Sequence, residues 1–198
     1  TLNNRSKITS VETGECVNLV LEKIIGVDIE NKEFMTLSAD NKTIKKYDIN
    51  DKLLLYKQGK VVDFNMYKSL VVTEMYDKKI KKSFNKLWSL ETGECICIFE
   101  QSIVRFSSDG EYVAVVRQQD KEVDIYSVET SEIVNTINYD YNWLRNVKFS
   151  IDGSLLLLHS LDDEIEIWSL ETNQTIKKIV EPEERKSFFS SEIIIRSN

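Results

Sequence analysis

One phrase occurs four times in the chain, and this repetition constrains the fold more than any other feature. Residues 10–16 read SVETGEC and residues 89–95 read SLETGEC, and looser copies follow at 127–132 (SVETSE) and 169–174 (SLETNQ). A phrase that recurs along one chain is the signature of a structural unit that is itself repeated. The fold is therefore expected to be built from copies of one small unit.

The spacing of the copies gives the size of that unit. A marker residue precedes each phrase, and Tyr47 in TIKKYDIND fills the gap between the first two copies. The five markers are Thr9, Tyr47, Trp88, Tyr126 and Trp168, separated by 38, 41, 38 and 42 residues. A period near 40 residues is typical of a supersecondary unit repeated along the chain.

Each unit reads as four short strands joined by tight turns. Residues 147–150 (VKFS) precede an Asp-Gly turn, the apolar run 155–160 (LLLLHS), the alternating run 164–170 (EIEIWSL) and the final run 174–180 (QTIKKIV). Asp-Gly between two apolar runs is a strong hairpin signal, because Gly accepts the positive φ that such turns require. The pattern predicts an all-β fold of four-stranded antiparallel units.

We expect one β region over residues 1–198, with four full units and a partial unit at each end. The approximate repeats are 1–22 (partial), 23–60, 61–102, 103–140, 141–181 and 182–198 (partial). The Glu-Thr-Gly phrase is expected to form the turn between the third and fourth strands, with Gly14 and Gly93 in the left-handed conformation. The continuous apolar second strands are expected to be buried on both faces.

The charge and hydropathy of the chain argue against several classes of protein. A net charge of -7 and a pI near 5.0 argue against a general nucleic-acid binder, which needs a basic surface. Apolar runs long enough to span a bilayer and the apolar core of a signal peptide are missing from the sequence. We therefore expect a soluble protein of the cytoplasm without membrane insertion, and the missing initiator Met suggests a piece of a longer chain.

The repeated units are similar to those of the WD-repeat family of β-propellers, and the resemblance covers essentially the whole chain. The family hallmarks are a Trp near the end of the third strand, an Asp six residues earlier, a Ser two residues before that Asp, and an Asp-Gly turn after a V-x-F-S strand. The fifth unit matches best, with Ser160, Asp162, Trp168 and the segment VKFSIDG.

The other units depart from the family pattern at several positions. In the fourth unit Tyr126 replaces Trp, Asp120 lies six residues earlier, and Gln118 replaces Ser. In the second unit Asp40 lies one place from its expected position, and the third unit has Trp88 without a matching Asp. The Gly-His pair that usually opens a repeat is absent, so the family's His-to-Asp hydrogen-bond network is not expected here.

The resemblance implies a β-propeller whose blades are the four-stranded units. Two arrangements remain open. The chain is either part of a larger ring or a closed ring of five blades, in which the last partial unit completes the first. The usual blade number in the family favours the larger ring.

Catalytic, metal and cofactor sites receive little support from the sequence. His159 is the single histidine, and the neighbouring Ser160 and Asp162 already have a structural interpretation in the repeat. Cys95 and Cys97 lack the four-ligand pattern of a structural zinc site, so we interpret them as packing residues. Phosphate-binding glycine motifs do not occur. We expect no enzyme activity, no cofactor, no metal and no small-molecule substrate.

A lysine-rich segment is the one feature that the repeat does not explain. Residues 78–82 read KKIKK, in a unit whose turn between the second and third strands is expected to be about four residues longer than in its neighbours. This interpretation places positive charge on one rim of an acidic protein. The segment is either a solvated loop or a contact for an acidic partner, phosphate or RNA, made by Lys78, Lys79, Lys81 and Lys82.

A second candidate surface lies between the fourth and fifth units, in the segment NYDYNWLRN. Its aromatic side chains and one arginine have the composition of a protein-binding hot spot, although packing between units explains them equally well. The residues are Tyr139, Tyr141, Trp143 and Arg145. Solvent exposure distinguishes these two interpretations.

The function implied by the family resemblance is a non-catalytic scaffold that binds other proteins in a larger intracellular complex. The alternative is a module that contacts RNA, phosphate or an acidic partner through residues 78–82. A fold alone does not identify a partner, because function resides in the loops that a fold carries.

Overall fold

The computed structural model of the chain describes residues 6–9, 16–20, 22–28, 30–48, 53–100 and 103–180. The predicted turn at Gly14 and the predicted partial unit 182–198 lie outside these residues. The chain divides into two compact units. Unit 1 comprises residues 1–82 and 86–98, and unit 2 comprises residues 83–85 and 99–198.

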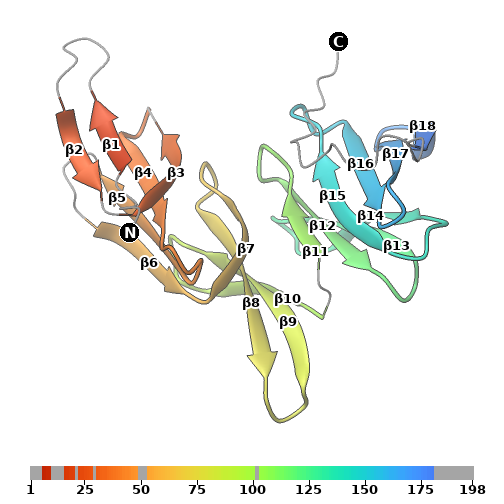
Figure 1. The fold of residues 1–198 in the computed structure, drawn as a ribbon, viewed down its shortest axis with the longest axis horizontal. Coiled ribbons are helices and arrows are strands. Elements are labelled where there is room, and N and C mark those ends of the chain that lie inside the picture. Colours follow the sequence, from red (N-terminus) through yellow and green to blue (C-terminus); the bar gives the residue numbers. More distant parts are fainter. Residues whose placement is uncertain are drawn as a thin grey trace. The chain divides into compact units, whose positions relative to one another are not determined.

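The sheets of the N-terminal half follow one another along the chain (Figure 1). A two-stranded sheet contains β1 (Ser6–Thr9) and β2 (Cys16–Val20). The first four-stranded sheet contains β3 (Lys23–Asp28), β4 (Glu33–Leu37), β5 (Thr43–Asp48) and β6 (Leu53–Gln58). The second contains β7 (Lys60–Asn65), β8 (Leu70–Asp77), β9 (Lys82–Ser89) and β10 (Cys95–Phe99).

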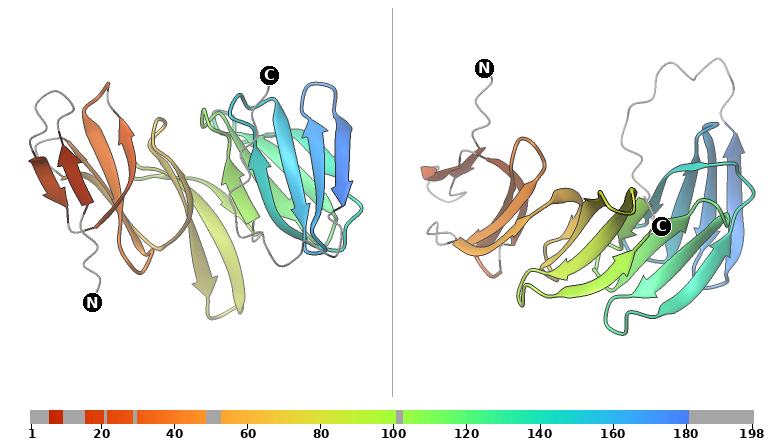
Figure 2. Two further views of the ribbon diagram at one scale, coloured as in Figure 1. Left: turned by 45° about the horizontal axis from the view of Figure 1, so that its top comes forward. Right: turned by 90° about the horizontal axis from the view of Figure 1, so that it is seen from below.

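Unit 2 contains two further four-stranded sheets, which lie side by side in both views of Figure 2. The first contains β11 (Ile103–Phe106), β12 (Tyr112–Arg117), β13 (Glu122–Ser127) and β14 (Ile133–Asn138). The second contains β15 (Leu144–Phe149), β16 (Leu155–Ser160), β17 (Glu164–Ser169) and β18 (Gln174–Val180).

Strands that follow one another in the sequence are neighbours in every sheet. The prediction of an all-β fold with four-stranded antiparallel sheets is confirmed, and the described residues contain no helix. The second strand lies inside each four-stranded sheet and is also its most buried strand, as the apolar runs predict. In β12 four successive residues from Val113 to Val116 are buried, and in β16 Leu156, Leu157 and Leu158 are buried.

The marker residues occupy corresponding places in these sheets. The pairing of third and fourth strands is interrupted by a bulge at Tyr47, at Tyr126 and at Trp168, and β1 has the same interruption at Thr9. A bulge places two residues of one strand opposite one residue of its partner and increases the local twist. The repeat in the sequence therefore corresponds to a repeated backbone irregularity.

The Glu-Thr phrase forms the turn between third and fourth strands. Gly93 has a φ of +75°, and its amide donates to the Ser89 carbonyl at 3.0 Å. Ser131 and Asn173 occupy the same turn position with φ values of +58° and +53°. The left-handed conformation is therefore required by the turn even where the sequence lacks Gly, and there it costs conformational energy.

Replacement of Ser131 by Gly is expected to stabilise unit 2 by about 0.5–1 kcal/mol, because the gain from relieved strain exceeds the larger entropy of an unfolded Gly. Urea unfolding of the variant and the parent protein measures the difference. Asn173→Gly is the control: its side chain accepts a hydrogen bond from the Trp168 indole at 3.2 Å, so the same change should give a smaller gain. A lower stability of Ser131→Gly than of the parent would contradict the argument.

A second turn is built around a serine and an aspartate two residues later. In residues 150–155 the Ser150 hydroxyl donates to Asp152 at 2.6 Å and accepts from the Leu155 amide at 2.9 Å. Residues 107–112 make the same bonds through Ser107 and Asp109. Asp40, which is displaced from its expected position, forms the corresponding bond with Ser38 in the turn from β4 to β5.

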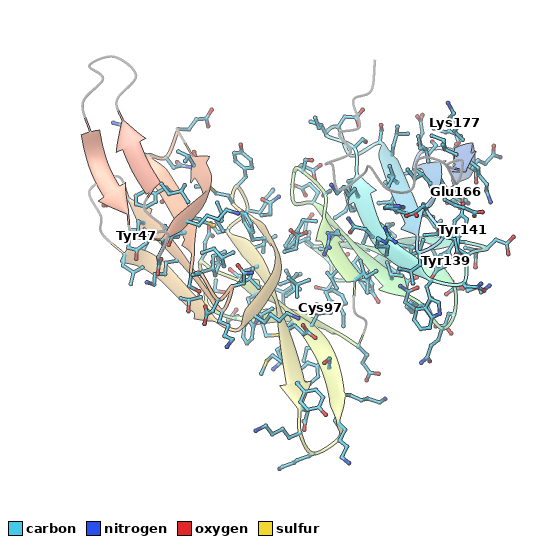
Figure 3. All side chains as sticks on the ribbon, viewed as in Figure 1. Tyr47, Cys97, Tyr139, Tyr141, Glu166 and Lys177 are labelled. Carbon is cyan, nitrogen blue, oxygen red and sulfur yellow. The ribbon has the colours of Figure 1, made fainter. Side chains whose placement is uncertain are left out.

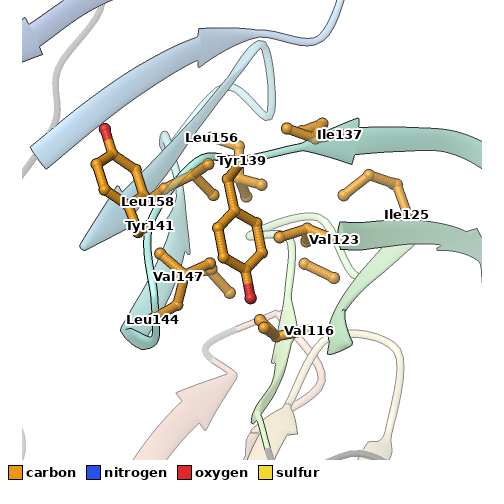
Figure 4. Packing of buried hydrophobic residues seen from close by; sticks show 11 residues of the cluster. Val116, Val123, Ile125, Ile137, Tyr139, Tyr141, Leu144, Val147, Leu156 and Leu158 are labelled. Carbon is orange, nitrogen blue, oxygen red and sulfur yellow. The ribbon is translucent and has the colours of Figure 1, made fainter. Parts of the chain in front are cut away.

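Each unit has an apolar core between its sheets. In unit 1 the buried cluster joins β4 and β5 to the β7–β10 sheet, through Met35, Ile44, Met66, Val71 and Leu90. In unit 2 the cluster fills the space between the β11–β14 and β15–β18 sheets (Figure 4). It contains Ala114, Val116, Val123, Ile125, Ile137, Tyr139, Tyr141, Leu144, Val147, Leu156 and Leu158.

Candidate functional site

The lysine-rich segment lies at the end of a long hairpin formed by β8 and β9 (Figure 1, yellow). Both strands have eight residues, whereas β12 and β13 have six each. The connecting segment, residues 78–81, is as long as residues 118–121 in unit 2. The expected longer turn is therefore wrong. The additional residues extend the strands, where backbone groups can pair across the hairpin instead of remaining in an open loop.

The tip of this hairpin presents positive and apolar side chains together. Ile80 is 61% exposed, Tyr76 60% and Met75 41%. The four lysines of the segment, Lys78, Lys79, Lys81 and Lys82, are all exposed. We call residues 75–82 the lysine hairpin. An exposed aliphatic and an exposed aromatic residue among cations form a surface suited to a partner with negative charge and apolar groups.

The turn at the tip is held by local hydrogen bonds. Asp77 Oδ1 accepts from the backbone amides of Lys79 at 2.7 Å and Ile80 at 3.4 Å, and Lys81 has a φ of +53°. At the base of the hairpin, Lys60 and Glu74 form an ion pair. The lysines of the tip are thus presented on a defined turn.

The predicted aromatic surface is wrong for two of its three aromatic residues. Tyr139 and Tyr141 are 6% and 8% exposed and belong to the core of unit 2, where Figure 4 shows the Tyr139 ring at the centre of the cluster. The segment that carries both tyrosines connects the two sheets of unit 2, and their rings fill part of the space between these sheets. Trp143 is 54% exposed, and Arg145 donates to Asp163 at 3.0 Å.

Tyr139 is part of a buried polar connection that the sequence did not indicate. Its hydroxyl donates to Gln118 Oε1 at 2.9 Å, and the same oxygen accepts from the Leu144 amide at 3.0 Å. Gln118 Nε2 donates to the Leu144 carbonyl at 2.6 Å. Gln118, which departs from the family pattern, therefore joins β12 to the first strand of the next sheet. Burial raises the pKa of Tyr139 to about 12.

A second polar cluster surrounds Glu166, which is only 2% exposed. Thr175 donates to its carboxylate, and Lys178 Nζ lies 3.5 Å from Oε2 and 5.4 Å from the centre of the Tyr141 ring. Burial, followed by the nearby Glu166 carboxylate, raises the pKa of Tyr141. Figure 3 labels both side chains. Because Lys178 compensates the buried charge, we interpret this cluster as a structural contact between the β15–β18 sheet and the segment that carries Tyr141.

These two tyrosines are expected to make the protein less stable in alkali. The pKa values of both tyrosines in the folded protein lie above the value near 10 of an unfolded tyrosine. The folded protein therefore keeps its full free energy of unfolding below about pH 10 and loses part of it as the pH rises through these higher pKa values. Ultraviolet titration of the phenolate band should show a late phase, in which Tyr139 and Tyr141 ionise above the ordinary tyrosine pKa near 10. Tyr139→Phe should remove part of the late phase. A titration in which all tyrosines ionise together near pH 10 would contradict this expectation.

The predicted repeat positions in the fifth unit have different surroundings. Ser160 is fully buried, and its hydroxyl accepts from the Glu164 amide at 3.0 Å. Asp162 is exposed. Its neighbour Asp163 lies 3.6 Å from His159 and also accepts from Arg145. Asp163 therefore connects this turn to its sheet through His159 and Arg145, and the role of Asp162 as a repeat position stays a prediction.

The aromatic markers make individual contacts rather than one shared bond. Trp88 Nε1 donates to Thr73 at 2.9 Å, and the ring of Tyr47 stacks on Phe34 at 5.3 Å. The predicted Asp120 accepts from Arg117 at 3.0 Å. The feature that Thr9, Tyr47, Tyr126 and Trp168 share is their place beside a bulge.

An ionic contact of unit 2 with a buried carboxylate was not indicated by the sequence. Asp124 is 2% exposed, and its Oδ2 lies 2.7 Å from Nε of Arg117. Thr136 donates to Oδ1 at 2.7 Å. The Asp124 carboxylate raises the pKa of Arg117, with the desolvation of the guanidinium opposing it. Asp124 and Glu166 each stand two residues before a marker, so this repeat position carries a buried carboxylate in both sheets of unit 2.

Cys95 and Cys97 differ in their exposure. Cys95 is exposed, so its interpretation as a packing residue is wrong; its place in the fourth strand puts it at the edge of the sheet. Cys97 is partly buried, and burial raises its pKa. Within the described ranges, His, Cys, Asp and Glu side chains form no group of three that could hold a metal ion.

The sequence matches no protein-family model. In the part of the chain that the structure describes, there is no helix of the length and apolar character needed to cross a membrane.

Proposed function

We propose that the chain is part of a WD-repeat β-propeller and acts as a non-catalytic scaffold that binds other proteins in a cytoplasmic assembly. The observation that carries this proposal is a repetition: the same bulge recurs in the β5–β6, β13–β14 and β17–β18 pairs, and the same turn recurs at Gly93, Ser131 and Asn173. Each sheet would be one blade. A larger ring is the favoured arrangement, and a closed ring of five blades is the alternative.

The lysine hairpin is the proposed contact for a partner. It extends from a sheet whose core is otherwise packed, and its lysines, Ile80 and Tyr76 are exposed. Such a surface favours a protein with an acidic and partly apolar face, because cations attract it during encounter and apolar side chains retain it.

Reversal of two hairpin charges, Lys79→Glu with Lys81→Glu, is expected to reduce the affinity for the partner about fivefold to tenfold. Lys23→Glu with Lys177→Glu is the matched control, since both lysines are exposed and the net charge changes equally. Affinity capture from the cells of origin identifies partners that the parent protein and the control retain and the hairpin variant loses. Binding of the identified partner is then measured by titration. Equal affinity of both variants would remove the lysine hairpin from the proposal.

The alternative function is contact with RNA or another phosphate-bearing ligand through the same hairpin. The observation that favours it is the group of four exposed lysines with an exposed tyrosine, because aromatic rings stack on bases while cations bind phosphates. Salt distinguishes the two functions. Binding to RNA should weaken steeply between about 50 and 200 mM salt, while a protein partner held by apolar contacts should lose much less affinity.

A further inference from the structure

A groove of about 310 Å³ opens in unit 2 where the inter-sheet core meets the turns. One wall belongs to the β11–β14 sheet, and the other consists of turn residues of the β15–β18 sheet. Its lining residues are Tyr112, Ile125, Val134, Asn135, Gly153, Ser154, Leu170 and Glu171. We call this cavity the turn-side groove. All of it lies within one compact unit, so it does not depend on the arrangement of the two units.

The groove is lined by both apolar and polar side chains and is open to solvent. Ile125 is 2% exposed and continues the buried core, whereas Tyr112 and Val134 are 39% and 55% exposed. Exposed aromatic and branched side chains beside a cavity are a feature of surfaces that receive an apolar side chain from a partner. Gly153 lies on the opposite wall, where an added Cβ would lie 3.8 Å from Asp109 Oδ2, an ordinary van der Waals distance.

The surroundings of the groove carry negative charge. In an antiparallel meander, the turn between the first two strands and the turn between the last two lie at the same end of the sheet. The four turns at this end of unit 2 comprise residues 107–112, 127–132, 150–155 and 169–174, and they contain no Lys or Arg. Their acidic residues are Asp109, Glu111, Glu129, Glu132, Asp152 and Glu171.

We infer that the turn-side groove binds a basic segment of a partner protein, with one aliphatic side chain of that segment in the groove and its Lys or Arg residues against the acidic turns. The charge excludes an acidic segment or a nucleic acid by repulsion, and the apolar floor favours a segment that is not purely cationic. This surface is opposite in charge to the lysine hairpin, and the inference holds whether or not the hairpin binds a partner.

A fluorescent peptide Lys-Lys-Ile-Lys-Lys, added to the full chain at low salt, tests the inference by anisotropy. The parent protein is expected to bind it, and replacement of the peptide's Ile by Gly should weaken binding about tenfold, because the groove then loses its apolar occupant. Replacement of the four peptide lysines by Ser or by Glu should also abolish most of the binding. Equal binding of the Ile and Gly peptides, or of the Lys and Ser peptides, would overturn the inference.

The protein side of the test uses one glutamate and its counterpart in the other unit. Glu171→Lys should weaken binding of the parent peptide about fivefold, since it places a cation in the groove lining. Glu91→Lys is the control, because Glu91 is exposed at the same position of an identical Ser-Leu-Glu-Thr turn outside the groove. Thermal unfolding verifies that both variants fold. Equal affinity of the two variants would place the peptide elsewhere and refute the assignment.

Discussion

Replacement of Arg117 by Met is expected to lower the free energy of unfolding of unit 2 by about 2–3 kcal/mol. The Arg117 guanidinium lies 2.7 Å from the Asp124 carboxylate, which is 2% exposed. Among the described residues, the hydrogen bond from the Thr136 hydroxyl is then the remaining side-chain hydrogen bond to the buried Asp124 carboxylate. The expected loss is smaller than for a fully buried pair, because a third of the Arg117 side chain is in contact with water.

A double variant separates the cost of an unpaired charge from the value of the pair. Arg117→Met combined with Asp124→Leu removes both charges and should recover most of the lost stability, since an apolar pair often replaces a buried ion pair at little cost. Urea unfolding, followed by hydrogen exchange in peptides from residues 103–180, measures the effect in unit 2. If the double variant is as unstable as the sum of the single variants, the two side chains do not act as a pair.

Replacement of Leu158 by Ala is expected to destabilise unit 2 by about 3 kcal/mol. Leu158 has no exposed surface, lies in the central strand β16 and packs in the cluster between the two sheets (Figure 4). Removal of its side chain leaves a cavity bounded by strands on both sides, and strands held in ladders cannot move inward to fill it.

Ile176→Ala is the matched control for this cavity. Ile176 has a side chain of the same size in the same sheet, but it is 59% exposed on the outer strand β18. Its replacement should change stability by less than about 0.5 kcal/mol. Both variants are compared by urea unfolding and by hydrogen exchange of β15–β18. Similar losses in the two variants would show that the apolar cluster is not the main source of stability in unit 2.

The turns were the most predictable part of this structure. Asp-Gly and Glu-Thr-Gly give a local hydrogen-bond pattern that needs only a few consecutive residues, and residues 107–112 and 150–155 both form it. The four-stranded sheets were predictable for a similar reason, because a period near 40 residues with regular turns leaves few other ways to pair the strands.

The candidate sites were much less predictable, because composition alone does not decide exposure. Tyr139 and Tyr141 have the composition of a binding surface, yet both are core residues. Glu166 alternates with Ile165 and Ile167 in β17, and the alternation alone suggests that Glu166 faces water. It is instead among the most buried residues, with Lys178 beside it.

The strands, their order in each sheet and most of the tight turns could be predicted from the amino-acid sequence, because these features depend on residues that lie close along the chain. The packing of the sheets against one another sets which face of each sheet is covered. A period of two residues separates the faces of a strand but does not say which face meets the next sheet. That choice buried Asp124 and Glu166, opened the turn-side groove and left the lysine hairpin in solvent.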